Sequence, residues 1–170
     1  KLSVMFLCRF QNFGLWNILS QIYHMETMIF QHQRYKIFTN VMKISGNRSN
    51  GSGAGVILDG NGSFIMTGGK ITGNKVGEGY GAGVYVGGGT FDMYGGSISG
   101  NNQLGWNYNG DGGGVYINSG SFNLHDGTIT GNNGYWGGGV NLYNGAFNME
   151  GGKISNNTAG RNGTGGGVYV

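Results

Sequence analysis

The sequence lacks proline altogether, and it contains a single cysteine, Cys8, among its 170 residues. One cysteine excludes an internal disulfide framework and a zinc site built from cysteine ligands. No apolar run approaches the roughly 18 residues that mark a membrane-spanning helix, so no transmembrane segment is predicted. The apolar stretch 3–8 is too short for a signal-peptide core, and no small-residue cleavage site follows it. These absences argue against a disulfide-stapled module and against a helical membrane protein.

Charged side chains are also scarce, at 10% of the residues, and they are unevenly placed. Residues 1–40 carry a net charge of +3, whereas residues 41–170 contain six Lys or Arg and six Asp or Glu. A balanced count predicts no basic stripe of the kind that binds nucleic acid or anionic lipid. We therefore expect no nucleic acid as a partner.

What the chain has in abundance is glycine, with 40 residues. Collagen is excluded because there is no proline and glycine does not recur at every third position. Disorder is disfavoured, since 38% of the residues are hydrophobic, 13% are aromatic and few are charged. Glycine at this density within apolar sequence is typical of a folded unit with many tight corners.

A repeat becomes visible when the chain is aligned on the motif GGGV or GAGV. The motif valines are Val56, Val84, Val115, Val140 and Val168, spaced 28, 31, 25 and 28 residues apart. Each of the first four is followed at nearly constant intervals by a phenylalanine, an isoleucine and an asparagine. These are Phe64, Phe91, Phe122 and Phe147; Ile71, Ile98, Ile129 and Ile154; and Asn74, Asn101, Asn132 and Asn157. A period of this length is typical of stacked repeat architectures.

Within each repeat, apolar and polar residues alternate, as Val84 and Val86 do around Tyr85, which predicts three short strands joined by glycine corners. Only the link from the isoleucine to the next valine varies, from 11 to 17 residues. The pattern predicts an all-β fold, a right-handed parallel β-helix (solenoid) with three short strands and 25–31 residues per coil. We expect it to span residues 41–170 and to be cut short at the C-terminus.

The segments GTFDMYGGSISGN (residues 89–101) and GGGVYV (residues 165–170) resemble the glycine-rich right-handed β-helix repeats of bacterial surface proteins. That group includes adhesin-like proteins, autotransporter passengers and polymorphic outer-membrane proteins. The resemblance implies an extracellular or cell-surface fragment that interacts with glycans or host surface molecules. Because the same architecture also carries enzymes, the alternative is a set of non-catalytic coils from a polysaccharide lyase or glycosidase.

Residues 1–40 differ from the repeats, with one glycine and many aromatic residues. Several apolar residues fall at helical spacing: Leu15, Ile18, Leu19, Ile22, Met25 and Ile29. One interpretation is an amphipathic helical cap that covers the open end of the solenoid. The other is a segment that is not native protein, and the sequence leaves both open.

Residues that could carry catalysis or bind metal do not cluster in this sequence. His24 and His32 have no spaced acidic partners, and the single aspartate of Asn109–Gly114 does not recur as calcium-binding repeats require. Glu150 and His125 would lie one coil apart, and we interpret that pair as a surface contact. No helix follows the Gly-x-Gly motifs, so they do not predict a nucleotide loop. We therefore predict no catalytic residue, no metal site and no cofactor.

The columns of asparagine and phenylalanine are predicted to be structural ladders along the axis. The better binding candidates are surface aromatic residues, either in an outward strand position or in the variable links. They are Tyr85 and Tyr116 on strands, and Tyr80, Trp106, Tyr108, Tyr135 and Trp136 in links. Two simpler explanations stay open, namely the strand propensity of tyrosine and packing of the loop rings over glycine-rich coils.

A flat face with outward Thr72, Ser99, Thr130 and Ser155 raises a third hypothesis, ice binding. Charged residues in the neighbouring column, such as Lys70, interrupt the regular hydroxyl array and argue against it.

Overall fold

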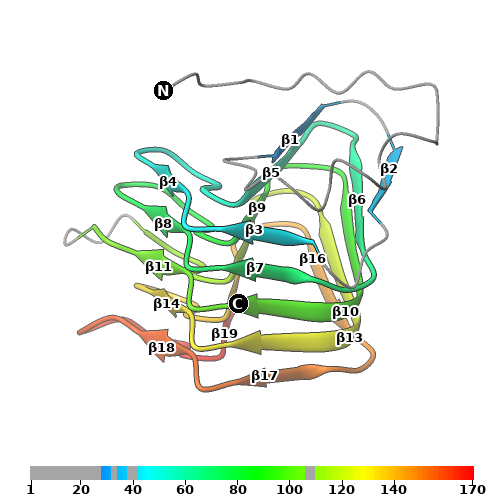
Figure 1. The fold of residues 1–170 in the computed structure, drawn as a ribbon. Coiled ribbons are helices and arrows are strands. Elements are labelled where there is room, and N and C mark those ends of the chain that lie inside the picture. The colour runs from blue at the N-terminus through cyan, green and yellow to red at the C-terminus, as the bar shows by residue number, and fades with distance from the viewer. Residues whose placement is uncertain (1–27, 32–33, 38–41, 106–109) are drawn as a thin grey trace.

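The computed structural model describes residues 28–31, 34–37, 42–105 and 110–170. This part of the chain folds as a right-handed parallel β-solenoid of about five turns, with about 27 residues per coil. All of its regular elements are strands, and it contains no helix. Figure 1 shows the coils stacked in chain order, from the cyan strands to the orange and red ones, so each strand lies against its counterparts in neighbouring coils. The predicted fold class is confirmed.

The first sheet contains the valine strands of every coil. In spatial order its strands are β1 (Met28–Gln31), β5 (Val56–Asp59), β9 (Val84–Val86), β12 (Val115–Ile117), β15 (Val140–Leu142) and β19 (Val168–Tyr169). The motif valines pair in register along it, since Val84 is opposite both Val56 and Val115. The first four motif valines are buried and Val168 packs against the core, so the register is the one that keeps an apolar side chain inside every coil.

The second sheet contains the phenylalanine and isoleucine strands. Its separate strands are β2 (Arg34–Ile37), β6 (Ser63–Met66) and β16 (Ala146–Met149) in the phenylalanine half, and β3 (Lys43–Ser45), β7 (Lys70–Thr72) and β17 (Lys153–Ser155) in the isoleucine half. In the two middle coils both halves run on as single strands, β10 (Thr90–Ser99) and β13 (Ser121–Thr130). The register between these two strands shifts near Tyr94, as a bulge does where a strand bends.

A third sheet runs through the variable links. It consists of two-residue strands, β4 (Arg48–Ser49), β8 (Lys75–Val76), β11 (Asn102–Gln103), β14 (Asn133–Gly134) and β18 (Thr158–Ala159). The repeat pattern did not predict these strands, because two residues are too few to show alternation. They matter for function because they hold the start of each link in register before the link diverges.

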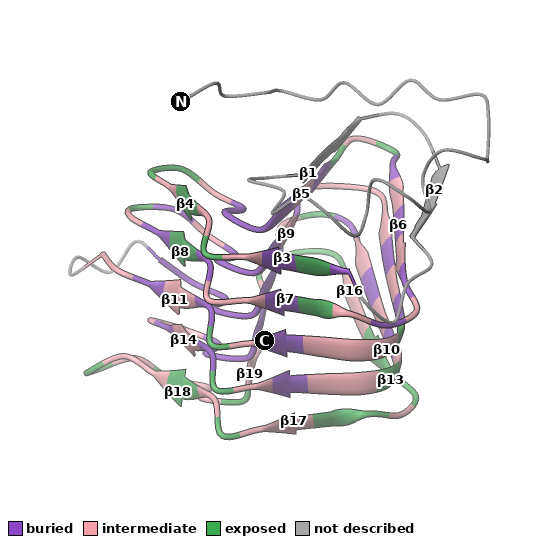
Figure 2. Cartoon of the chain, viewed as in Figure 1, coloured by how far each residue is buried: buried purple, intermediate pink, exposed green. Residues whose placement is uncertain are grey.

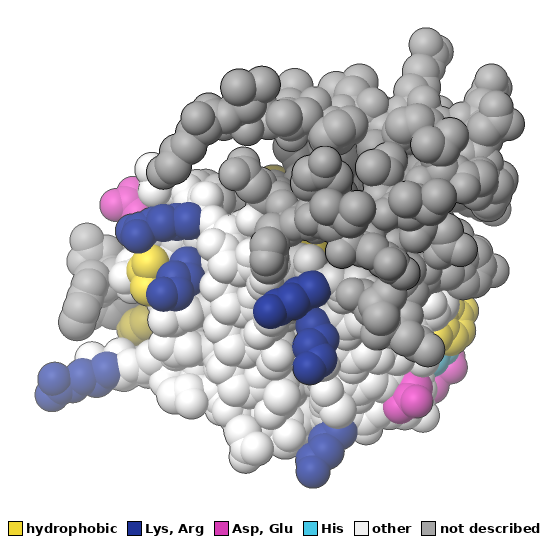
Figure 3. Space-filling model, viewed as in Figure 1, with side chains coloured by type: hydrophobic (Ala, Val, Ile, Leu, Met, Phe, Trp, Pro, Cys, Tyr) yellow, Lys and Arg dark blue, Asp and Glu magenta, His cyan; other side chains and the backbone are white. Residues whose placement is uncertain are grey.

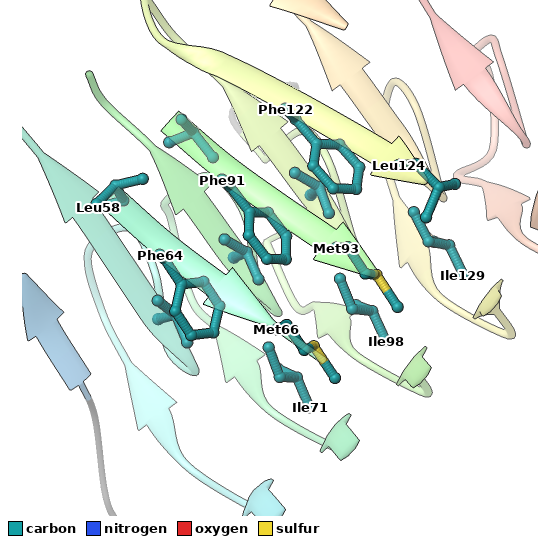
Figure 4. Close-up of a cluster of buried hydrophobic side chains, with 14 of the residues drawn as sticks. Leu58, Phe64, Met66, Ile71, Phe91, Met93, Ile98, Phe122, Leu124 and Ile129 are labelled. Carbon is teal, nitrogen blue, oxygen red and sulfur yellow. The ribbon is translucent and has the colours of Figure 1, made fainter. Parts of the chain in front are cut away.

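The interior is filled by ladders of identical or similar side chains. Phe64, Phe91 and Phe122 are fully buried and stack with ring centroids 4.8 and 4.7 Å apart (Figure 4). Phe147 continues the stack at 5.3 Å from Phe122. Figure 2 shows buried positions along the inner side of the strands, with intermediate and exposed positions between them. The predicted phenylalanine ladder is confirmed, and its spacing equals the separation of neighbouring strands.

The asparagine column forms a continuous hydrogen-bonded chain. The Nδ2 of Asn74 donates to Oδ1 of Asn101 at 2.9 Å, and Nδ2 of Asn101 donates to Oδ1 of Asn132 at 2.9 Å. Each of these amides also donates to a backbone carbonyl of the isoleucine strand, as Asn101 does to Ile71 at 3.0 Å. Their Oδ1 atoms additionally accept from the backbone N–H of the preceding asparagine. These buried amides are therefore fully satisfied, which confirms their structural role.

Glycine occupies the corners for two different physical reasons. Gly100 has a φ of 61°, and an added Cβ would meet nothing closer than 3.8 Å, so backbone conformation alone selects glycine there. Gly83 is different, because a Cβ would lie 2.5 Å from the carbonyl oxygen of Gly114 and 2.9 Å from Nδ2 of Asn101. Close stacking of coils therefore excludes any side chain at Gly83.

The strand pairing extends to residues N-terminal of the expected boundary at residue 41. Strand β1 pairs with β5, and β2 pairs with β6, both in parallel. Ile29, the last residue of the predicted amphipathic helix, is in strand β1 instead. The other residues of that predicted helix, Leu15 to Met25, lie outside the described residues. The role of residues 1–27 as a cap or a non-native segment stays a prediction.

Candidate functional site

The outer face of the first sheet positions a row of side chains that the repeat does not hold constant. Because the flanking apolar residues, such as Val84 and Val86, are buried, the residue between them points outward. In order along the axis this column reads Ile57, Tyr85, Tyr116, Asn141 and Tyr169. Three of its five members are aromatic, so the column presents rings to the adjacent links.

Tyr116 is the centre of a tyrosine cluster. Its ring stacks on Tyr80 at 4.6 Å, on Tyr85 at 5.7 Å and on Tyr143 at 6.3 Å between centroids. Tyr80 comes from the link before β9, whereas Tyr143 follows β15. Tyr116 is only 4% exposed, but Tyr143 is 74% exposed. The cluster therefore has one buried ring in contact with one exposed ring and two partly exposed rings.

The electrostatic setting of the cluster keeps the phenols of Tyr85 and Tyr116 neutral. Burial raises the pKa of Tyr116 well above the ordinary value, and Asp111 and the neighbouring tyrosines raise it further. Burial also raises the pKa of Tyr85, with a smaller contribution from Asp59. Protonated hydroxyls can both donate and accept hydrogen bonds, which suits recognition of uncharged polar groups.

A second aromatic group lies beside the cluster, around Trp136. The indole stacks on Tyr169 at 5.7 Å and contacts the edge of Tyr135 at 5.2 Å. The backbone N–H of Trp136 donates to the carboxylate of Asp111 at 3.4 Å. Burial raises the pKa of Asp111 to about 6, although this hydrogen bond opposes the shift.

Asn141 connects the two groups within the outward column. It is 2% exposed, and its Nδ2 donates to the carbonyl oxygen of Trp136 at 3.4 Å. Its Oδ1 is buried and has no hydrogen-bond partner among the described residues. A buried acceptor without a hydrogen bond lowers the stability of the folded chain, so Asn141 Oδ1 retains an unused hydrogen-bonding capacity at this surface. We use the term aromatic surface for Tyr80, Tyr85, Tyr116, Trp136, Asn141, Tyr143 and Tyr169.

The structure brings most of the predicted binding residues together. Tyr80, Tyr85 and Tyr116 meet in the tyrosine cluster, and Tyr135 and Trp136 contact each other in the second group. Trp106 and Tyr108 lie outside the described residues. A role for these residues in ligand binding stays a prediction, and the burial of Tyr116 limits that ring to supporting its neighbours.

Tyr143 was missed by sequence analysis, although it is the most exposed ring of the cluster. The alternation of side chains along a strand could have indicated it. A residue three positions after the motif valine points to the same side of the sheet as the residue one position after that valine. The equivalent positions in other coils are Asp59, Gly87 and Asn118, so no aromatic column drew attention to it.

A separate polar cluster lies on the outer face of the second sheet. His125 Nδ1 is 2.7 Å from Glu150 Oε2, and His125 Nε2 is 3.7 Å from Asp92 Oδ1. The imidazole also stacks on Tyr94 at 4.2 Å, with the planes 5° apart. The predicted contact between Glu150 and His125 is thus present. Within the described stretches, no group of three potential ligands is arranged to hold a metal ion.

No protein-family model, curated protein or solved structure matches this chain. None of the described residues forms a helix that is both long and apolar enough to cross a membrane.

Proposed function

We propose that this chain is the repeat scaffold of a secreted or surface-exposed bacterial adhesin-like protein, which binds glycans or host surface molecules. The observation that carries the proposal is the aromatic surface on the first sheet. Its rings come from several consecutive coils and from the links between them. Bacterial origin and an extracellular or cell-surface location rest on the resemblance of the repeats.

The geometry of the aromatic surface favours a carbohydrate ligand. Tyr143 is exposed, while Tyr85 and Trp136 are partly exposed and held by ring contacts on a rigid strand scaffold. Flat aromatic faces bind the apolar face of a ring, and the phenol and indole edges supply hydrogen-bonding groups. Asn141 lies between Tyr116 and Tyr169 in the outward column, and its unpaired Oδ1 is an acceptor suited to a hydroxyl group.

A glycan array probed with the full chain tests this proposal. We expect retention of one or more uncharged glycans, with affinity weakened at least about tenfold by Tyr143→Ala or Trp136→Ala, as loss of a well-placed aromatic contact implies. Tyr94→Ala is the matched control, since Tyr94 is also exposed (51%) but lies on the second sheet. The proposal fails if no glycan is retained, or if the control variant weakens binding equally.

The alternative, coils of a carbohydrate-active enzyme, is separated by a product assay. Incubation of the full chain with polysaccharides should release no new reducing or unsaturated ends if the chain only binds. Release that is abolished by His125→Ala would favour the enzyme, because His125 and its two carboxylate neighbours are the described residues best placed for proton transfer.

A further inference from the structure

The described residues separate positive from negative charge, although the charge count of residues 41–170 is balanced. The Lys and Arg of this stretch are Lys43, Arg48, Lys70, Lys75, Lys153 and Arg161. Figure 3 shows Lys and Arg side chains gathered on the face that carries the isoleucine half of the second sheet and the third sheet, with Asp and Glu at its margins. The absence of a basic stripe that binds nucleic acid or anionic lipid stays a prediction, but the balanced count did not reveal that the cations share one face.

Four of these cations form two pairs, each across neighbouring coils, at one end of the face. Lys43 pairs with Lys70 across β3 and β7, and Arg48 pairs with Lys75 across β4 and β8. All four side chains are exposed. Neighbouring parallel strands lie about 4.8 Å apart, so each pair places two positive charges side by side. We call Lys43, Arg48, Lys70 and Lys75 the cationic quartet.

Like charges at directly opposed positions destabilise a sheet unless a counter-charge is bound. The ion pairs between described residues both belong to His125, so no described carboxylate neutralises the quartet. The described residues therefore place like charges side by side with no carboxylate partner among themselves, and an external polyanion would relieve that repulsion.

The rest of the face carries hydroxyl and amide groups in place of apolar side chains. Beside the quartet run Ser45, Thr72 and Ser99, and the hydroxyl of Ser99 donates to that of Thr72 at 3.2 Å. Asn102 and Asn133 continue the column of Arg48 and Lys75, and their side-chain amides are linked at 3.0 Å. These groups can exchange hydrogen bonds with a hydroxyl-rich chain laid across the coils.

We propose that this face binds an anionic polysaccharide, with the cationic quartet holding its carboxylate or sulfate groups. A single-stranded nucleic acid is a poorer fit, because the outward residues of β3, β4, β7 and β8 include no aromatic ring on which bases could stack. An anionic membrane is also a poorer fit, because those positions offer no apolar side chain for insertion. The site is separate from the aromatic surface and does not depend on its function.

The test measures binding of the full chain to immobilised heparin and to polygalacturonate, which separate sulfate from carboxylate recognition. We expect binding to at least one of them, falling steeply as salt rises, since counterion release drives such contacts. Lys43→Gln/Lys70→Gln should weaken it by about tenfold or more, as removal of two of the four charges implies. The matched control, Lys153→Gln/Arg161→Gln, removes the same charge outside the quartet and should have a much smaller effect.

Several results would overturn this inference. They are no salt-sensitive binding to either polymer, equal loss in both double variants, or stronger binding to single-stranded DNA or to phosphatidylglycerol vesicles than to the polysaccharides. Thermal melting of Lys43→Gln/Lys70→Gln checks the fold, and we expect a melting temperature equal to or above that of the unmodified chain. Retention of uncharged glycans by the same variant separates this site from the aromatic surface.

Discussion

The inside and the outside of the solenoid obey different rules. The interior repeats identical or similar apolar residues from coil to coil, as Phe64, Phe91 and Phe122 do. The outward column of the first sheet changes from Ile57 to Tyr85 to Asn141 within a few coils. Interior side chains must fill a fixed spacing between strands, whereas outward ones face only the links and solvent. Variation outside a constant interior is therefore where specific binding can reside.

The largest effect should come from breaking a ladder. Phe122→Ala removes a fully buried ring that stacks on both Phe91 and Phe147, which should lower the free energy of unfolding by about 3–5 kcal/mol. Denaturant titration followed by circular dichroism measures the loss. Tyr143→Ala, on the outer face, is the control and should change stability far less. Similar losses in the two variants would show that the outer rings belong to the core.

The next effect concerns the space between coils. Gly83→Ala would place a methyl group 2.5 Å from the carbonyl oxygen of Gly114, and the neighbouring backbone cannot move without disturbing its own hydrogen bonds. We expect a loss of about 1–3 kcal/mol, as for other overpacked sites. The same titration measures it, and a variant as stable as the unmodified chain would show that adjacent coils can separate.

A smaller effect should depend on pH. Burial raises the pKa of Asp111 from 3.8 to about 6, so the folded chain binds this proton more tightly than the unfolded chain. The associated stability is present below the unfolded value and is lost as pH rises through the folded one. The side chain of Asp111→Asn is neutral at every pH. The melting temperature of this variant minus that of the unmodified chain should therefore increase as the pH is raised from 4 to 7. A constant difference across that range would contradict the shift.

The smallest effect should come from a substitution at a corner where only the backbone conformation, and no close contact, favours glycine. Gly100 has a positive φ with open space around it, and Asn156 adopts a φ of 56° at the equivalent corner of a later coil. Gly100→Asn should cost only about 1 kcal/mol or less, because asparagine tolerates this region. Comparison of its unfolding midpoint with that of Gly83→Ala tests whether the two glycine columns have separate causes. Equal costs would reject that distinction.

The ladders could be predicted because one residue type recurs in each coil, and Phe, Ile and Asn columns each have an evident physical role. The two-residue strands such as β8 could not, since pairing with neighbouring coils defines them and their sequence does not. The burial of Tyr116 could not be predicted either. The Tyr80 ring that stacks on it belongs to a link, and the repeat pattern does not determine the path of that link. The cationic quartet could not be predicted from the charge count. Its members are 5 to 32 residues apart in sequence, and only the stacking of coils places them on one face.

The asparagine ladder also gives the solenoid a direction. From Asn47 through Asn74, Asn101 and Asn132, each Nδ2 donates to the Oδ1 of the next coil, and none of these bonds runs the other way. Amides aligned head to tail polarise one another, so the ladder has a donor end and an acceptor end. A coil packed upside down would meet it with like groups facing each other. The ladder thus disfavours a coil stacked in the reversed orientation. The apolar columns have no donor or acceptor end and cannot impose this constraint.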